Sequence, residues 1–171
     1  MLATETTSTS TRASIHTLDT LAALYRAARC PTNMHAADGA LVGRMLAVRG
    51  IPAPIAARLR TWAASPSFVW EGKTFQATSD TRGDGFNRVS VPSVLGRQRL
   101  FPFATSFGPS AIDGAPTLVL DYELTVNPPY IRRIHDEIRE VAPGLFLGPA
   151  MWKRGGDKAL VLWFALDARL S

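Results

Sequence analysis

The stretch "SFVWEGKTFQATS", residues 67–79, decides the expected fold, because the chain changes there from a helical to an extended pattern. Its residues alternate between two faces, as in a strand, where successive side chains point to opposite sides. One face would carry Phe68, Trp70 and Thr74, and the other Val69, Glu71, Lys73 and Phe75. This alternation predicts a strand that opens a β-sheet.

Five further strand patterns follow it along the chain. They cover residues 86–91, 97–107, 117–124, 144–153 and 158–170. Tight turn signals, "DTRGDG" (80–85) and "RGGD" (154–157), separate some of them, and Pro102 indicates an edge or a bulge. Short links between successive strands favour an antiparallel sheet, strongly curved or closed.

Before residue 67 the chain has the periodicity of short amphipathic helices. These are expected over residues 18–29, over residues 39–49 and from Pro54 onward. The Ser- and Thr-rich residues 1–15 are typical of a disordered tail. We therefore expect residues 16–171 to form one domain, with a helical layer over 16–66 and a sheet or barrel over 67–171.

The charged stretch "NPPYIRRIHDEIREVAPGLFLG", residues 127–148, is expected to contain a helix over residues 128–142. Asn127 would be its N-cap, and Pro143 and Gly144 would end it. At helical spacing four apolar residues form a buried stripe: Ile131, Ile134, Ile138 and Val141. Arg132, Asp136 and Arg139 would then face solvent, whereas His135 and Glu137 would flank the stripe.

The expected fold class is α+β. It is a curved antiparallel six-stranded sheet or a small β-barrel, with N-terminal helices and one helix inserted before the last two strands.

Composition limits the classes of function. The net charge of +5 permits anionic partners, but the arginines are scattered and no compact basic block occurs, so nucleic-acid binding is not expected. A single cysteine excludes an internal disulfide. No apolar run approaches the ~18 residues that span a bilayer, and no secretory signal is visible, so we expect a cytoplasmic protein without a membrane span.

Cofactor and metal chemistry are not expected either. The sequence contains no phosphate-binding loop, no dinucleotide-binding motif and no nucleophile elbow. Its three histidines lack the spacing of metal ligands. Whether the chain forms a homodimer is left open.

Several polar residues lie on patterns that leave two interpretations open. Lys73 either faces outward as a surface lysine or points into a barrel, where it would need a carboxylate or an anionic ligand. Tyr122 shares a face with apolar residues and either anchors the sheet or contacts a ligand, while Asp121 lies on the opposite face. Arg97 and Arg99 share a face and could clamp a carboxylate or a phosphate.

The elements "GKTF", "IDGAPTLVLDY", "IRRIHDEIREVAPGLFLG" and "LWFAL" resemble a group of uncharacterised bacterial proteins over residues 70–166. Their pattern runs GK-x-F, a D-G loop, an L-D-Y strand, I-R-D-E-I-R-x-V-x-P-G-L-Y-L-G and a final aromatic strand. This chain departs from it by the inserted "IH" before Asp136 and by Phe146 in place of tyrosine.

The "WEGKTF" element is also similar to GxWxG-type calycin-like domains. That similarity implies a small barrel with an internal cavity and no particular reaction.

The leading hypothesis is binding of a small, largely apolar molecule with a polar or anionic group, such as a lipid, an isoprenoid or a polyketide. The candidate ligand-binding residues are Trp70, Lys73, Arg99, Arg133 and His135. Whether the protein is an enzyme is left open. Metal-free acid–base chemistry of an isomerase, cyclase or lyase would use Glu137 or Asp121 as base, with Tyr122 or Lys73 stabilising the developing negative charge. The alternatives are an interaction module with a filled barrel and a basic nucleic-acid binder.

Overall fold

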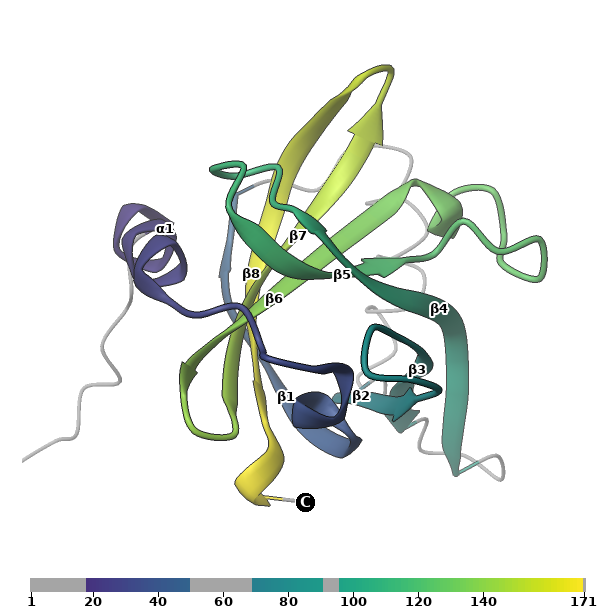
Figure 1. The fold of residues 1–171 in the computed structure, drawn as a ribbon. Coiled ribbons are helices and arrows are strands. Elements are labelled where there is room, and N and C mark those ends of the chain that lie inside the picture. The colour runs from purple at the N-terminus through teal and green to yellow at the C-terminus, as the bar shows by residue number, and fades with distance from the viewer. Residues whose placement is uncertain (1–17, 50–68, 91–95, 171) are drawn as a thin grey trace, which may run out of the picture.

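The computed structural model describes residues 18–49, 69–90 and 96–170, and it is organised around a closed β-barrel (Figure 1). The eight strands are β1 (Gly39–Val48), β2 (Val69–Ala77), β3 (Arg82–Ser90), β4 (Arg97–Pro109), β5 (Pro116–Asp121), β6 (Ile134–Ala142), β7 (Leu145–Arg154) and β8 (Asp157–Asp167). Each strand pairs antiparallel with the next in the sequence, and β1 pairs with β8 to close the barrel. Because the barrel is closed, each of these eight strands is paired on both sides.

The expected barrel is confirmed, but the number of strands and helices differs from the expectation. The barrel has eight strands rather than six. The helix expected near residue 18 is α1 (Leu18–Ala27), followed by a short 3-10 turn, η1 (Met34–Ala37). The expected helix from Pro54 and the expected tail over residues 1–15 lie outside the described residues.

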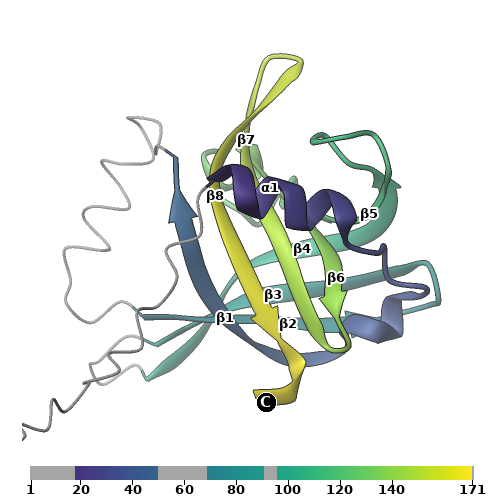
Figure 2. The ribbon, with the colours of Figure 1, turned by 90° about the vertical axis from the view of Figure 1, so that its left-hand side faces the viewer.

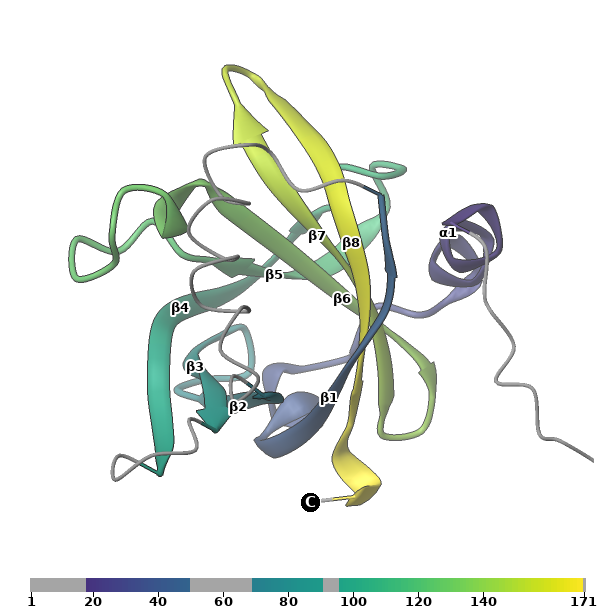
Figure 3. The ribbon, with the colours of Figure 1, turned by 180° about the vertical axis from the view of Figure 1, so that it is seen from behind.

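The helix expected over residues 39–49 is wrong, because this segment is β1. It lies between β2 and β8 and joins the two ends of the sheet (Figure 3). A Cβ on Gly43 would lie 2.5 Å from the Trp70 ring. The absence of a side chain at Gly43 therefore lets the Trp70 ring pack against the β1 backbone. Pairing on both sides outweighs the helical spacing of the apolar residues.

The helix expected over residues 128–142 is also wrong. The segment forms a short 3-10 turn, η2 (Ile131–Arg133), and then β6. Along β6, Asp136 and Ile138 lie on the inner side of the barrel, whereas Glu137 and Arg139 lie on the side of α1. Asp136 is therefore buried inside the barrel, and Glu137 and Arg139 are buried beneath α1, so none of the three is solvated.

The barrel interior holds the main core. Its buried apolar side chains come from nearly every strand and include Leu41, Phe75, Phe103, Leu118, Leu120, Ile138, Phe146, Phe164 and Leu166. Met34 and Ala37 of η1 join this core near the β2–β3 turn, where the Met34 N–H donates to the Asp80 carbonyl. Thus η1 packs against one end of the barrel.

A second, smaller core lies between α1 and the outer face of the barrel (Figure 2). Leu21 and Tyr25 of α1 pack on Leu147 and Trp163, and the Tyr25 and Trp163 rings are 5.4 Å apart.

Among the described residues no helix has the length and apolar character needed to cross a bilayer.

Candidate functional site

A bulge in β2 determines which residues point into the barrel. The β2–β3 register shifts between Trp70 and Gly72, and Gly72 has a φ of +129°. The bulge breaks the simple alternation, so Trp70 and Lys73 both pack inside although their spacing of three would place them on opposite faces. The inward interpretation of Lys73 is therefore the one that holds in the structure.

Lys73 is the centre of a polar cluster inside the barrel. Its ammonium donates three hydrogen bonds, to Asp136 Oδ2 at 2.9 Å, to Asn87 Oδ1 at 2.9 Å and to the Tyr122 hydroxyl at 2.5 Å. These bonds use all the donors that an ammonium group has. We call Lys73, Asn87, Tyr122 and Asp136 the interior polar cluster.

The other members of the cluster are also closely paired. The Tyr122 hydroxyl donates to Asp136 Oδ2 at 3.0 Å and accepts a bond from Asn87 Nδ2. Asn87 Oδ1 also accepts from Trp70 Nε1 at 3.1 Å, and Asn87 Nδ2 donates to the Phe101 carbonyl.

One polar atom of the cluster has no partner: Asp136 Oδ1 is buried and accepts no hydrogen bond. The described residues contain three other such atoms, Arg88 Nε, Thr105 Oγ1 and Trp163 Nε1, but Asp136 is the only carboxylate among them. An unsatisfied buried carboxylate oxygen is the costliest of these to maintain.

The surroundings of the cluster are aromatic. Lys73 Nζ lies 5.2–5.6 Å from the ring centroids of Trp70, Phe103, Tyr122 and Phe164, within reach of cation–π attraction. Burial lowers the pKa of Lys73, although the Asp136 carboxylate opposes this shift. Burial and the same carboxylate raise the pKa of Tyr122 well above its ordinary value.

The cluster lies toward the barrel end opposite η1, where β5 ends and β6 begins. Apolar side chains packed on the core are only partly buried there: Trp70, Phe101, Tyr130, Ile134, Ala150 and Leu162. Phe101 has a φ of 53°, the one positive value among the described residues other than glycine. Its carbonyl accepts the Asn87 bond, so the cluster is coupled to a strained residue, a feature that often marks functional sites.

Glu137 and His135, two other candidates, lie outside the barrel beneath α1. Glu137 accepts hydrogen bonds from the Tyr25 and Ser110 hydroxyls, the Ala111 N–H and His135 Nε2. Burial raises the pKa of Glu137, but these hydrogen bonds outweigh it and hold the pKa below its ordinary value. Glu137 is thus fully engaged in holding α1 and the 110–116 loop on the barrel.

The remaining candidates are distributed over the surface. Asp121 accepts a 3.3 Å bond from Lys153 at the exposed end of β5. Arg133 lies over the Trp152 ring at 5.9 Å, and Arg99 lies over Phe86 on the outer face of β3 and β4. The structure brings together Trp70, Lys73 and Tyr122, but neither Glu137 nor Asp121 joins them.

Sequence reasoning missed two members of the interior polar cluster, Asn87 and Asp136. Helical spacing predicts that Asp136 faces solvent, whereas strand spacing puts it on one face with Ile134 and Ile138. Asn87 shares a face with Val89 in "FNRVSV", which is a weak signal of burial.

No group of three or more His, Cys, Asp or Glu side chains suited to a metal ion occurs within residues 18–49, 69–90 and 96–170.

Comparisons with known proteins support the fold alone. No protein-family model matches the chain, and no curated protein matches it. A crystal structure of a protein from Thermomonospora curvata is similar, with a TM-score of 0.51 and 16% sequence identity. The similarity covers 88% of this chain and 86% of that one.

Proposed function

We propose that this protein binds a small, largely apolar molecule inside the barrel, with a polar group of the molecule against Asp136. Eight-stranded barrels are wide enough either to be filled by side chains or to hold one small ligand. The observation that carries the proposal is the unpartnered Asp136 Oδ1 in an otherwise fully paired cluster.

The pairing of the cluster indicates which polar group would fit. The three donors of Lys73 are all used within the cluster, and Asp136 neutralises its charge. An anionic group would meet no free donor there. The free position is an acceptor, so a hydroxyl or an N–H group is favoured over a carboxylate.

The energetic cost of the cluster supports a role beyond stability. A buried ion pair is weak support for stability, because an apolar pair of similar volume is often as stable. Asp136 is only 3% exposed, so a ligand would reach it when partly buried side chains at this end, such as Trp70 and Leu162, rotate aside. The apolar body of the ligand would then replace their contacts with the core.

The proposal is limited to binding. The catalytic version of the hypothesis names Glu137 or Asp121 as the base, and neither carboxylate contacts Tyr122: Glu137 bonds Tyr25, and Asp121 pairs with Lys153. The filled-barrel interaction module predicts instead that no small molecule enters the barrel.

Two fluorescent probes can distinguish small-molecule binding at Asp136 from a filled barrel that admits no ligand. N-phenyl-1-naphthylamine is apolar and carries one N–H donor, and its N-methyl derivative lacks that donor. We expect the first probe to bind about tenfold more tightly than the second, the effect of one hydrogen bond to a carboxylate.

The matched variants are Lys73→Met with Asp136→Leu, and Arg154→Gln on the exposed end of β7 as a control. The double variant should lose the preference for the N–H probe, and the control should keep it. Equal affinity of wild type for both probes, or no binding of either, would overturn the proposal.

A further inference from the structure

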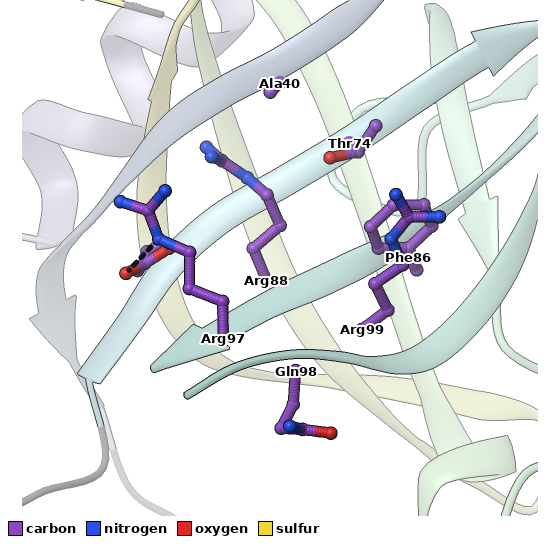
Figure 4. Close-up of a pocket in the computed structure, with 8 residues that line it drawn as sticks. Ala40, Thr74, Phe86, Arg88, Arg97, Gln98 and Arg99 are labelled. Atoms are coloured by element: carbon purple, nitrogen blue, oxygen red, sulfur yellow. Dashed lines mark hydrogen bonds and ion pairs between the residues drawn. The ribbon is translucent and has the colours of Figure 1, made fainter. Parts of the chain in front are cut away.

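The outer face of β1–β4 carries a pocket of about 460 Å³, on the opposite side of the barrel wall from the interior polar cluster (Figure 4). Its lining residues are Ala40, Glu71, Thr74, Phe86, Arg88, Arg97, Gln98 and Arg99. We call this pocket the outer groove. Its volume falls within the range of about 300–1,000 Å³ that is usual for small-molecule sites.

Two arginines lie side by side in the outer groove. Arg88 and Arg99 are direct partners in the β3–β4 register. Both side chains carry a positive charge, so together they make the groove favourable for an anion. The groove has a single carboxylate, Glu71, which pairs with Arg97 at 3.2 Å. Within the described residues, neither Arg88 nor Arg99 has a carboxylate partner.

The Arg88 side chain is held across the floor of the groove. Its guanidinium donates to the Leu41 carbonyl at 2.7 Å, reaching from β3 over β2 to β1 (Figure 4). The Arg88 side chain crosses β2 beside Gly72, its partner in the β2–β3 register, where no side chain blocks the path to the Leu41 carbonyl. Because Arg88 Nε is buried and unpaired, the guanidinium still has hydrogen-bonding capacity that the protein does not satisfy.

Within the part of the chain that the structure describes, the Arg99 side chain is held by stacking on an aromatic ring. Its guanidinium carbon lies 4.8 Å from the centre of the Phe86 ring. A stacked guanidinium keeps its edge free to bond an oxyanion, and its outer face can stack on a further aromatic ring. Figure 4 shows Arg88 between Arg97 and Arg99, with the Arg99 guanidinium over the Phe86 ring.

We infer that the outer groove binds a small aromatic organic phosphate. The phosphate oxygens would accept hydrogen bonds from Arg88 and Arg99, since charged, forked donors match phosphate geometry. The volume exceeds what a bare phosphate needs, and the Phe86–Arg99 stack offers a flat surface for the aromatic part. This site is independent of the function proposed for the barrel interior.

The test uses phenyl phosphate and inorganic phosphate as probes, titrated by calorimetry at low ionic strength. Wild type should bind phenyl phosphate more tightly than inorganic phosphate, with an affinity that falls as salt is added. Arg99→Gln should weaken both probes about tenfold or more, the usual effect of losing one charge-assisted hydrogen bond. Phe86→Leu removes the ring that holds Arg99, so it should weaken both probes, and phenyl phosphate more than inorganic phosphate.

Arg154→Gln is the charge-matched control and should bind both probes as wild type does, as should the variant with Lys73→Met and Asp136→Leu. Arg99 makes no hydrogen bond to another described side chain, so its variant should fold, which far-ultraviolet circular dichroism would check. Equal affinities in wild type, Arg99→Gln and Arg154→Gln would overturn the inference. So would a short oligothymidylate that displaces phenyl phosphate and binds far more tightly at equal salt, because the groove would then be a nucleic-acid surface.

Discussion

Lys73 Nζ and Asp136 Oδ2 lie 2.9 Å apart inside the barrel, and each side chain is only 4% exposed. They come from β2 and β6, 63 residues apart in the sequence, so the closed barrel alone brings them together. An ion pair this deeply buried is costly to desolvate, and it depends on both partners being present.

Removing one partner of this pair should therefore destabilise the protein more than removing both. Asp136→Leu leaves the Lys73 ammonium buried without its counter-charge, which costs roughly 3–5 kcal/mol of the free energy of unfolding. Lys73→Met combined with Asp136→Leu should recover most of that loss. Urea unfolding of the two single variants and the double variant measures the coupling.

The opposite outcome is simple additivity. If the double variant loses as much free energy of unfolding as the two single variants together, the pair does not act as a unit and the description of the cluster is wrong.

Gly72 should tolerate no side chain. Its φ of +129° is unfavourable for other residues, and a Cβ would clash with the Leu41 carbonyl. We expect Gly72→Ala to lose roughly 1–3 kcal/mol or more in the free energy of unfolding, from backbone strain. Gly156→Ala is the matched control, because no atom lies within 4 Å of a Cβ there. Similar thermal unfolding midpoints for the two variants would count against the bulge.

Acid should weaken the attachment of α1 through Glu137. Its folded-state pKa lies below the ordinary 4.5, so its contribution to stability is fully present above pH 4.5. That contribution is lost as the pH falls below 4.5 and through the folded-state pKa, where Glu137 becomes protonated. Glu137→Gln should thus be less stable than wild type near neutral pH and lose less additional stability in acid.

The comparison for this pH prediction is Glu123→Gln, because the Glu123 side chain is 69% exposed and bonds only at the surface. Denaturant midpoints measured from neutral pH to about pH 3 should fall in parallel for wild type and Glu123→Gln. A Glu137→Gln curve parallel to that of wild type would show that Glu137 is not the group responsible.

The strands after residue 67 could be predicted because alternation and turn signals act locally. β2, β4 and β7 lie within a few residues of their expected positions. Closure of the barrel is a long-range property. Leu41, Met45 and Leu46 have the spacing of a helix, but pairing with β2 and β8 makes the segment a strand, β1.

The nature of β6 was hidden because both of its faces are buried. In a strand with one solvent-exposed face, apolar and polar residues alternate along the sequence. In β6, Asp136 faces the barrel core and Glu137 faces α1, so charged residues occur on both sides. Adjacent charges with i,i+4 partners then resemble a solvated helix. Because of this helix-like charge pattern, the sequence did not indicate Asp136 as a site residue.

The orientation of Lys73 also depended on a feature that alternation cannot reveal. Parity along β2 separates Trp70 from Lys73, whereas the bulge at Gly72 brings both inside. A glycine within a strand pattern is a known signal of a bulge. It gives no orientation until the partner strands are known.

The most direct test of small-molecule binding in the barrel is native mass spectrometry of the protein purified from its own host. We predict that wild type and Arg154→Gln carry the same added mass of one small molecule, and that the variant with Lys73→Met and Asp136→Leu carries none. A wild-type protein with no added mass, or the same added mass in all three proteins, would contradict the account.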